Sequence, residues 1–455
     1  MQEPQAYDVL IIGAGQAGIP LAYSLAGEGR SVALAERKHL GGSCVNFGCT
    51  PTKAAIASGG VAAQARRAAE FGVTVPEVGV DFPKVLGRAR GIVENKTGGI
   101  EEGLNNTDNP ELIWGQARIE GRESGGFRVN VGDRTVLARE VVLDTGTRTA
   151  VPPVEGLSEM DFIHSGNWLQ HEEVPGHLAV IGGGYIGLEM AQLYRRMGSR
   201  VTVIGSAERV AKNEDEDVSD ALQSLLEEEG VEFRLGARAE KAENDGGGVR
   251  LSLDNGETLE ATDVFVATGR RPNTDDLGLE NAGLDLPDSG VVEVDERLRT
   301  AVEGLWAAGD IRGGPMFTHT AYDDFRVIRS QMTGDGSHTT ERVVPYAIFT
   351  DPELGRVGMT EREARDSGYD YEVKSFDMAN DGKAQEIGET AGFIKVIINR
   401  SDDTILGAAV LAHSGGELVH LYVDLMNAGA PYTVMRDAVH THPTLAEAVQ
   451  SAVAS

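Results

Sequence analysis

Short apolar runs that lead through a glycine-rich turn into a helical pattern occur twice, at residues 7–18 and 178–187. The helical patterns reach to about residue 27 and over residues 188–197, and each is followed by another apolar run, at residues 31–35 and 200–204. Continuous apolar runs of this length are typical of parallel strands that are buried on both faces. The pattern therefore predicts two doubly wound α/β units.

Beyond residue 340 the pattern changes to alternating and apolar strands mixed with helices, without a glycine-rich turn. Strands are expected at residues 346–350, 392–399 and 405–411, and helices at residues 360–366, 415–427 and 444–453. This mixture is an α+β pattern. The whole chain is therefore expected to be α/β, with two Rossmann-like domains and a C-terminal α+β domain over residues 336–455.

The two turns carry the glycine fingerprint of a dinucleotide-binding fold, with Gly13, Gly15 and Gly18 in the first and Gly182, Gly184 and Gly187 in the second. Such glycines permit a tight turn and let the backbone approach a pyrophosphate at the helix start. Glu36 ends the strand after the first fingerprint, where a carboxylate can accept from ribose hydroxyls. A tight βα turn without a nucleotide is the alternative.

The strand after the second fingerprint ends in Gly205-Ser206 instead of an acid. An acid at this point would bind the ribose 2′-hydroxyl of NAD and repel a 2′-phosphate. Its absence favours NADPH, with NADH as the other candidate. Arg209 or Lys212 can bind the phosphate, although both can equally be solvated loop cations.

Both cysteines of the chain, Cys44 and Cys49, lie in a glycine-flanked stretch over residues 41–53, ahead of an alanine-rich helical pattern at residues 54–70. A helix start concentrates positive potential and lowers the pKa of a thiol. Two cysteines this close in a large chain favour a redox pair. A structural disulfide and two buried thiols are the alternatives.

The formal net charge of the 455 residues is −30, which argues against binding to nucleic acid or anionic membranes. The uncharged stretch at residues 9–27 is nearly long enough to span a bilayer. Its four glycines and Pro20 are instead typical of strand, turn and helix. Because residues 1–4 lack the basic region of a signal peptide, we expect a cytoplasmic protein with a solvated acidic surface.

The cysteine stretch resembles the redox-active motif of the class I pyridine nucleotide–disulfide oxidoreductases, which include glutathione reductase, dihydrolipoamide dehydrogenase and mercuric reductase. The similarity covers nearly the whole chain in the family's order: the two fingerprints and residues 143–146 (LDTG), 264–273 (VFVATGRRPN), 304–310 (GLWAAGD) and 440–447 (HTHPTLAE). Residues 317–325 (FTHTAYDDF) are most similar to the mercuric-reductase-like branch, here without its C-terminal cysteine pair.

The resemblance assigns FAD to the first fingerprint and a nicotinamide nucleotide to the second. It implies that Thr145, Gly146 and Asp310 contact the flavin, Asp310 at its ribityl and phosphate region. An ordinary helix N-cap is the alternative for Asp310. The resemblance also implies that the flavin domain is discontinuous, over residues 1–150 and 265–335, around a nucleotide domain at residues 151–264. Arg270 belongs to the segment that returns from the nucleotide domain to the flavin domain, and we count it among the cofactor-binding candidates.

Three further residues near the flavin follow from the resemblance. Lys53 would pair with Glu189 beside the ring, where an ammonium stabilises negative charge on the reduced flavin; a surface helix pair is the alternative. Tyr185 would cover the flavin until the nicotinamide displaces it, with core packing as the alternative. His319 is either a flavin contact or a packed histidine at a helix start.

The motif near the C-terminus implies a catalytic base, His442, oriented by Glu447. A carboxylate on one ring nitrogen fixes the tautomer and raises the basicity of the other. In the family this histidine reaches the cysteines of the other subunit, so an obligate homodimer is expected. A His-x-His metal site is the alternative; it lacks a third ligand cluster in the sequence, and we expect no metal.

The resemblance implies that hydride passes from NADPH to the flavin and then to a Cys44–Cys49 disulfide, with Cys49 nearer the flavin and Cys44 as the interchange thiol. The substrate is a small disulfide or a thiol-reactive oxidant. Reduction of mercury(II), dihydrolipoyl dehydrogenase activity and a flavin-dependent NAD(P)H oxidase or quinone reductase are alternatives. A further alternative is a non-catalytic interaction protein that binds NAD.

Overall fold

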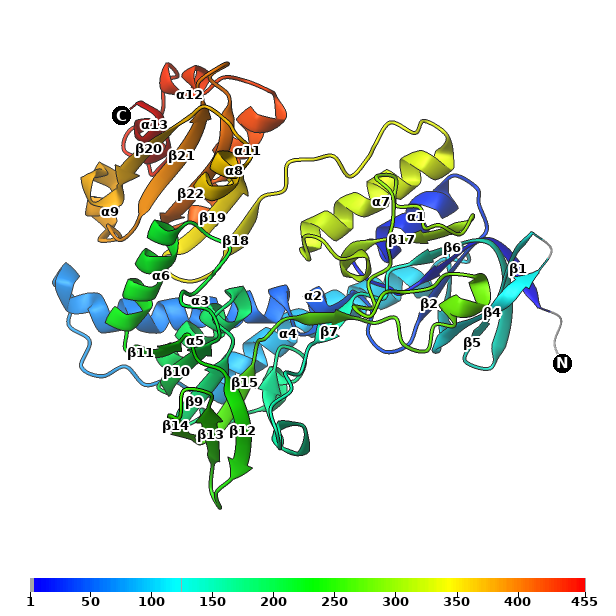
Figure 1. Ribbon diagram of the computed structural model, residues 1–455, viewed down its shortest axis with the longest axis horizontal. Coiled ribbons are helices and arrows are strands. Elements are labelled where there is room, and N and C mark those ends of the chain that lie inside the picture. Colours follow the sequence, from blue (N-terminus) through cyan, green and yellow to red (C-terminus); the bar gives the residue numbers. More distant parts are fainter. Residues whose placement is uncertain (1–3, 124, 455) are drawn as a thin grey trace.

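The computed structural model describes residues 4–123 and 125–454, arranged as three units around two long helices (Figure 1). The N-terminal unit contains a seven-stranded sheet of order β3-β2-β1-β6-β5-β4, with β17 beside β6. Its strands are β1 (Gln5–Ile12), β2 (Val32–Glu36), β3 (Glu111–Trp114), β4 (Ala117–Glu123), β5 (Gly126–Val131), β6 (Arg134–Leu143) and β17 (Leu305–Ala307). Helices α1 (Gly18–Gly27) and α7 (Thr318–Thr333) pack together over this sheet.

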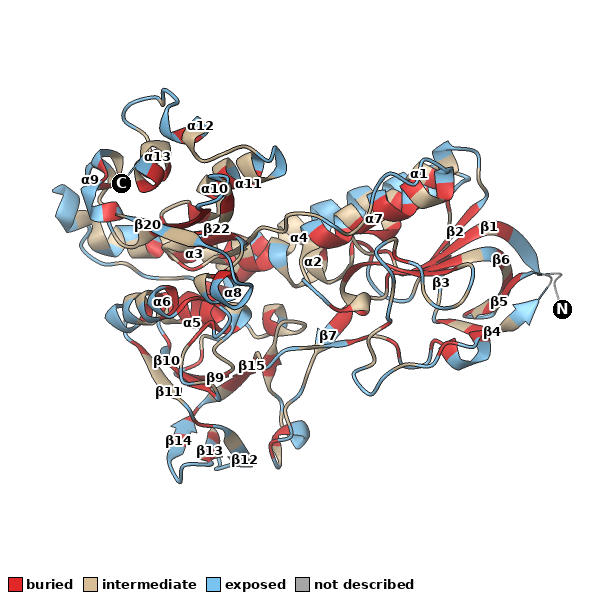
Figure 2. Ribbon diagram, turned by 45° about the horizontal axis from the view of Figure 1, so that its top comes forward, coloured by how far each residue is buried: buried red, intermediate tan, exposed pale blue. Residues whose placement is uncertain are grey.

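The central unit contains a five-stranded parallel sheet of order β11-β10-β9-β15-β8. The strands are β8 (Ile163–His164), β9 (His177–Ile181), β10 (Arg200–Gly205), β11 (Val231–Leu235) and β15 (Asp263–Val266), and the helices are α5 (Tyr185–Met197) and α6 (Glu216–Glu228). A small antiparallel sheet follows, made of β12 (Ala239–Asn244), β13 (Val249–Leu253) and β14 (Thr258–Ala261). The strands of both large sheets are largely buried (Figure 2), as their apolar runs predict.

The C-terminal unit is a five-stranded antiparallel sheet of order β18-β19-β22-β21-β20. Its strands are β18 (Tyr346–Ile348), β19 (Glu353–Gly358), β20 (Tyr371–Asp377), β21 (Phe393–Asn399) and β22 (Ile405–Ala412). Its helices are α8 (Glu361–Asp366), α9 (Gly382–Ile387), α10 (Gly415–Leu418), α11 (His420–Asn427), α12 (Thr433–Arg436) and α13 (Ala446–Ala454). The sheet buries an aliphatic core that includes Ile394, Val396 and Val410 against Tyr422 and Val449.

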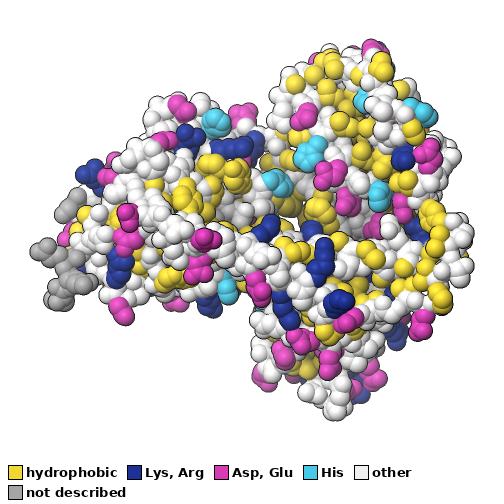
Figure 3. Space-filling view, turned by 180° about the vertical axis from the view of Figure 1, so that it is seen from behind, with side chains coloured by type: hydrophobic (Ala, Val, Ile, Leu, Met, Phe, Trp, Pro, Cys, Tyr) yellow, Lys and Arg dark blue, Asp and Glu magenta, His cyan; other side chains and the backbone are white. Residues whose placement is uncertain are grey.

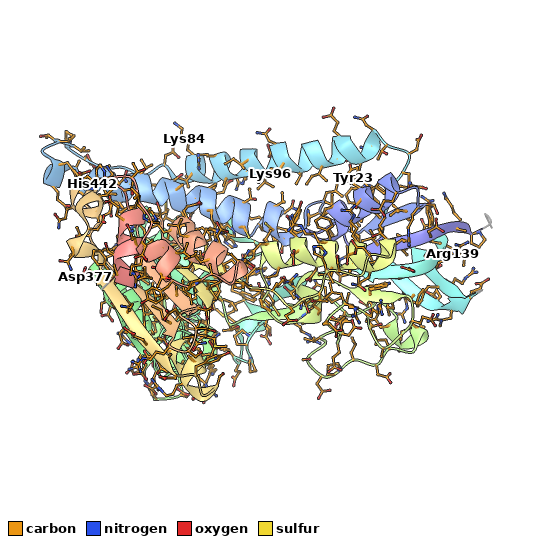
Figure 4. The ribbon with its side chains drawn as sticks, turned by 90° about the horizontal axis from the view of Figure 1, so that it is seen from above. Tyr23, Lys84, Lys96, Arg139, Asp377 and His442 are labelled. Atoms are coloured by element: carbon orange, nitrogen blue, oxygen red, sulfur yellow. The ribbon has the colours of Figure 1, made fainter. Side chains whose placement is uncertain are left out.

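Three connections hold the units together. A two-stranded ribbon, β7 (Thr147–Thr149) with β16 (Arg270–Pro272), joins the N-terminal and central units. Helix α2 (Gly42–Asn46) leads into α3 (Cys49–Arg67), which runs beside α4 (Phe82–Asn105) along one side of the molecule (Figure 4). The side chain of Asp81 caps α4 by accepting from the backbone of Lys84 at 3.1 Å. Short 3₁₀ helices occupy Ala68–Phe71, Leu157–Glu159, Trp168–Gln170, Leu279–Ala282, Gly309–Arg312 and Met378–Asn380.

The expected α/β class, with two Rossmann-like sheets and an antiparallel C-terminal domain, is confirmed, whereas the residue limits of the domains stay a prediction. Element boundaries differ in places. The helix expected from residue 54 begins at Cys49, and that expected from residue 188 begins at Tyr185. The helix expected at residues 415–427 is divided at Val419. Among the described residues, no helix is long and apolar enough to cross a bilayer, and residues 9–27 divide between β1 and α1.

Candidate active site

The cysteines lie where two helices begin. Cys44 belongs to α2, and Cys49 is the first residue of α3. Thr318, the first residue of α7, places its hydroxyl oxygen 3.2 Å from the sulfur of Cys49. Helix starts carry free backbone N–H groups and positive potential. Two such starts meeting at one sulfur favour its thiolate form.

Cys44 and Cys49 are both present as free thiols. The hydrogen bond from the Cys44 thiol lowers the pKa of Cys49 to about 6, and the Thr318 hydroxyl and the Lys53 ammonium lower it further against the opposing effect of burial. The same hydrogen bond, together with burial, raises the pKa of Cys44. The pair therefore has one sulfur poised as thiolate near neutral pH and one that needs a base to lose its proton.

Lys53 follows the cysteines by one turn of α3 and forms an ion pair with Glu189 of α5. The ammonium nitrogen is 2.6 Å from one carboxylate oxygen of Glu189, whose side chain is 5% exposed. The other oxygen accepts from the backbone N–H of Phe349 at 2.9 Å, and the Phe349 ring lies 4.5 Å below the ammonium. The pair expected from the sequence is thus formed, and the C-terminal unit completes it.

The cysteine stretch is held from outside its own sequence. The buried indole of Trp168 donates to the carbonyl oxygen of Phe47 at 2.9 Å. The side chain of Asn46 donates to the carbonyl oxygens of Leu40 and Gly42, each at 2.8 Å. Neither Trp168 nor Thr318 nor Phe349 was singled out from the sequence as a site residue, because each meets the site through a contact distant along the chain.

The first fingerprint forms the tight turn that its glycines predict. Gly13 has a φ of +110°, and a Cβ there would lie 2.2 Å from the carbonyl oxygen of Asp144. A Cβ at Gly18 would lie 2.2 Å from the carbonyl oxygen of Gly13. Glu36 accepts from the backbone of Ala14 at 2.9 Å, so the carboxylate stands at the fingerprint. This backbone cradle with an acid beside it fits a dinucleotide such as FAD.

The loops that meet at the ends of β6 and β17 bring the other flavin candidates together. Thr145 donates to the carbonyl of Asn273 at 2.8 Å, and the backbone of Asn273 donates to Gly146 at 2.9 Å. Thr147 donates to Asp310 at 2.9 Å and accepts from Arg270 at 2.6 Å. Asp310 lies inside a 3₁₀ helix whose N-cap is Ala308, so the alternative that it is a helix N-cap is wrong.

The second fingerprint repeats the geometry of the first but leaves its middle glycine open. A Cβ at Gly182 would lie 2.3 Å from the carbonyl of Ala267, and one at Gly187 would lie 1.9 Å from the oxygen of Gly182. No heavy atom of the described residues lies within 4 Å of the position that a Cβ would take at Gly184. The exposed backbone at the start of α5 fits the approach of a second pyrophosphate.

Arg209, one of the two expected phosphate ligands, forms ion pairs with two acids of α6. Its guanidinium lies 2.9 Å from Asp220 and 3.3 Å from Glu216. A 2′-phosphate at the end of β10 would therefore compete with these carboxylates for the cation. The ring of Tyr185, the first residue of α5, stacks on the ring of Tyr346 with centroids 5.4 Å apart.

His442 and Glu447 are in contact, as expected. The Nδ1 atom of His442 lies 3.1 and 3.2 Å from the two carboxylate oxygens of Glu447, which also accepts from the backbone of Thr444 at 2.9 Å. This backbone bond and then the histidine lower the pKa of Glu447. The imidazole of His442 is 78% exposed. It lies at the outer end of the C-terminal unit (Figure 4).

One group of three metal-ligating side chains occurs among the described residues: Asp351, Glu389 and His413. Asp351 lies 2.8 Å from Arg196, and Glu389 lies 3.1 Å from Arg67. Both acids therefore already have a cationic partner. Neither His440 nor His442 belongs to this group.

The chain matches two family models. One is described as pyridine nucleotide-disulphide oxidoreductase and matches residues 7–324; the other is the dimerisation domain of that family and matches residues 344–453. The probable pyridine nucleotide-disulfide oxidoreductase RclA of Escherichia coli K12 is 33% identical over 448 residues, which are 97% of this chain and 98% of that protein.

Two further relatives agree with this assignment. Dihydrolipoyl dehydrogenase of Geobacillus stearothermophilus is 33% identical over 450 residues, which are 98% of this chain and 95% of that protein. The solved structure of the HOCl-induced flavoprotein disulfide reductase RclA from Escherichia coli superposes with a TM-score of 0.90 at 33% identity, covering 98% of this chain and 99% of that chain. The chain therefore belongs to the pyridine nucleotide-disulphide oxidoreductase family, as a flavoprotein disulfide reductase with Cys44 and Cys49 as its redox pair and with the FAD and NAD(P)H typical of that family.

Proposed function

We propose that this enzyme uses NADPH to reduce a small disulfide or a thiol-reactive oxidant through the Cys44–Cys49 pair. The observation that carries the proposal is the unequal pair of thiols, with Cys44 in α2 and Cys49 at the start of α3, beside the Lys53–Glu189 ion pair. For a disulfide, the balanced reaction consumes NADPH, a proton and R–S–S–R, and yields NADP⁺ and two R–SH.

FAD, when bound, would carry the electron pair from the nicotinamide to the cysteine disulfide. The first fingerprint, Glu36 and the loop residues Thr145, Gly146, Arg270 and Asp310 would hold it. Lys53 would lie beside its reactive edge and favour negative charge there, while Glu189 holds the ammonium in place. Cys49, with its lowered pKa, would remain the thiolate that faces the flavin.

Cys44 would act on the substrate. Its thiolate attacks one sulfur of the substrate disulfide, so that a mixed disulfide forms and the first R–S⁻ leaves. The thiolate of Cys49 then attacks the sulfur of Cys44, which restores the internal disulfide and releases the second R–S⁻. Because the pKa of Cys44 is raised, this cycle requires a base that takes its proton and returns it to the leaving thiolate.

His442 of a second subunit would be that base, with Glu447 fixing its tautomer. Its imidazole is exposed at the outer end of its own C-terminal unit, and this unit matches the family's dimerisation domain. The same unit carries an apolar groove of about 280 Å³, which is lined by Leu421, Leu425, Val434, Met435, Ala438 and other residues. Val439, beside the groove, is 99% exposed. A second copy of the chain is the occupant that would bury these side chains.

NADPH is proposed over NADH because β10 ends in Gly205, which offers no carboxylate to a ribose hydroxyl. Arg209 would have to exchange an acid of α6 for the phosphate, so only a moderate preference for NADPH over NADH is expected.

Dihydrolipoyl dehydrogenase activity is the second candidate, since curated relatives with that name are 33% identical to this chain. The mercuric-reductase-like branch and a cytoplasmic location stay predictions.

The decisive measurement is anaerobic reduction followed by turnover. Stoichiometric NADPH should reduce the flavin of both the wild type and Cys44→Ser, but only the wild type should then turn over glutathione disulfide, lipoamide, hypothiocyanite or mercury(II). Loss of turnover by about a thousandfold is expected, because the attacking sulfur is gone. The variant Ser58→Ala, which removes only a 3.4 Å bond to Ala54 on α3, is the control.

Persistent turnover in Cys44→Ser would contradict the proposal and favour an oxidase or quinone reductase. A colourless protein without bound flavin would favour the non-catalytic alternative. The same assay run with NADH in place of NADPH ranks the two nucleotides by kcat/KM.

A further inference from the structure

Four aromatic rings from all three units form a row, which we call the ring row: Tyr185, Tyr346, Phe317 and His319. Successive centroids are 5.4, 5.3 and 5.4 Å apart, and successive planes differ by 21°, 11° and 7°. Near-parallel rings at this spacing attract one another beyond the area they bury. The row therefore fixes Tyr185 of the central unit against the other two units.

Tyr346 is the ring that the surroundings hold most firmly. Its hydroxyl donates to Glu214 at 2.5 Å. The other oxygen of Glu214 lies 3.2 Å from the guanidinium of Arg356, and the two side chains are 0% and 2% exposed. Arg356 also donates to the carbonyl of Ala408 at 2.8 Å. The ion pair with Arg356 holds the carboxylate of Glu214, whose other oxygen thereby offers the hydroxyl of Tyr346 a fixed acceptor.

The opposite end of the row is also tied. His319 donates from Nε2 to the carbonyl of Pro345 at 2.7 Å, directly before Tyr346 in the chain. Burial lowers the pKa of His319, so the ring stays neutral and keeps this tautomer. Phe317 lies between His319 and Tyr346. Tyr346 is thus held on one face while its other face receives Tyr185.

Tyr185 occupies a critical place on α5. It directly follows the open Gly184 of the second fingerprint and lies one helical turn before Glu189, so both side chains are on the same face of α5. A nicotinamide that extends from the fingerprint towards the Lys53–Glu189 pair must pass this ring. The ring instead lines a cavity of about 270 Å³ together with Asn213, Tyr346, Arg356 and Thr360, all from the central or C-terminal unit.

We propose that Tyr346 is a positioning residue for the nicotinamide: it holds the ring of Tyr185 at the seam between the central and C-terminal units, clear of the path to Lys53 and Cys49. This inference rests on the proposed function in that NADPH is the electron donor. Without the ring of Tyr346, Tyr185 occupies the path part of the time. The nucleotide then binds only to the remaining fraction of molecules, and its apparent dissociation constant rises by the inverse of that fraction.

The test is the rate of flavin reduction in the FAD-loaded enzyme as a function of NADPH concentration. Tyr346→Leu should raise the half-saturating NADPH concentration by about threefold to tenfold, as expected for a lost ring stack, while the limiting rate stays within about twofold. Tyr346→Phe keeps the ring and should recover most of the affinity. Tyr369→Leu, a change at a 40% exposed tyrosine of the same unit, is the control. The KM for the disulfide substrate should be unchanged in all three.

A double variant separates positioning from a merely structural role. In a Tyr185→Ala background the obstructing ring is absent, so adding Tyr346→Leu should have no further effect on NADPH affinity. An equal loss of affinity in both backgrounds, or wild-type affinity in Tyr346→Leu, would overturn the inference. If Tyr346→Leu does not retain FAD, Tyr346→Met replaces it with the same expected rise. Failure of the wild type to be reduced by NADPH would refute the proposed function instead.

Discussion

Asp144 places a carboxyl group beneath the first fingerprint that has no counterpart beneath the second. The carbonyl that Gly13 approaches belongs to Asp144, whereas the carbonyl that Gly182 approaches belongs to Ala267. The carboxyl group of Asp144 is therefore an addition beneath the first nucleotide turn. It accepts from the backbone of Gly18 at 2.8 Å. Burial raises its pKa well above the usual value, and the nearby Asp310 and Asp324 add to the rise.

Replacing Asp144 with asparagine should stabilise the protein increasingly as the pH rises. The folded state keeps the proton of Asp144 to a higher pH than the unfolded state, so its contribution to stability is lost as the pH rises from about 4 through the folded pKa. Asparagine can accept from Gly18 without titrating. We expect Asp144→Asn to gain on the order of 1–3 kcal/mol near neutral pH and little near pH 4.

Denaturant unfolding of the FAD-loaded protein across this pH range measures the effect. The exposed Asp288 offers a control, since Asp288→Asn should follow the wild type at every pH. A stability difference between Asp144→Asn and the wild type that does not depend on pH would show that Asp144 is not protonated in the folded state.

Helix α5 shows how one element serves both packing and binding. Its start must approach β9 closely, because a Cβ at Gly187 would lie 1.9 Å from the oxygen of Gly182. The same start must also leave its backbone open at Gly184. Five residues beyond Gly184, Glu189 reaches Lys53 of α3 and the backbone of Phe349. The helix thus links the nucleotide turn to the redox centre, and its two glycines have separable roles.

Alanine substitutions should separate these roles. Gly187→Ala forces α5 away from β9 and should cost about 2–4 kcal/mol of stability. Gly184 has a φ of −88° and open space around it, so Gly184→Ala should unfold like the wild type and instead raise the KM for NADPH several-fold, because its methyl group obstructs the pyrophosphate. Thermal unfolding together with steady-state kinetics tests both; equal stability of the two variants would contradict the packing role.

At the scale of the whole molecule, the residues of the proposed site lie in distant parts of the structure. The space-filling view shows a hollow between the N-terminal and C-terminal units (Figure 3). Helices α2 and α3, which carry the cysteines, lie below the N-terminal and C-terminal units in the view of Figure 1, while His442 lies at the outer end of the C-terminal unit (Figure 4). If His442 is the base, as proposed, a second subunit must bring it to the cysteines, which is the symmetric exchange of a two-fold dimer.

A hybrid dimer tests this exchange. Cys44→Ser and His442→Ala homodimers should each lose turnover, the second by a factor of about 10²–10⁴. A hybrid of the two, isolated with a different tag on each subunit, has one complete site if the histidine acts across the interface, and should regain about half of the wild-type activity. If His442 acted on its own cysteines, the hybrid would have no complete site and would stay inactive.

The sequence alone determined the features that depend on short stretches of chain. The fingerprints around Gly13 and Gly182, the Cys44–Cys49 pair and the His442–Glu447 contact are each encoded within a few residues, so spacing and resemblance were sufficient to predict them. The Lys53–Glu189 pair joins distant residues and was predictable only through the resemblance. Helix starts at Cys49 and Tyr185 were misplaced because poor helix formers in the first turns, Thr50 and Thr52 in one helix and Gly187 in the other, weaken the helical pattern that marks a boundary.

Only the tertiary structure decided which distant groups surround these motifs. Three of these groups come from 121 to 296 residues away: Thr318 beside Cys49, Phe349 beneath Lys53 and Trp168 behind the cysteine stretch. Contacts over such distances along the chain leave no periodic signal in the sequence. The same holds for the ring row and for the buried carboxyl of Asp144. The sequence specifies local conformation through spacing, whereas pKa shifts and the position of Tyr185 arise from packing between units, which depends on the whole fold at once.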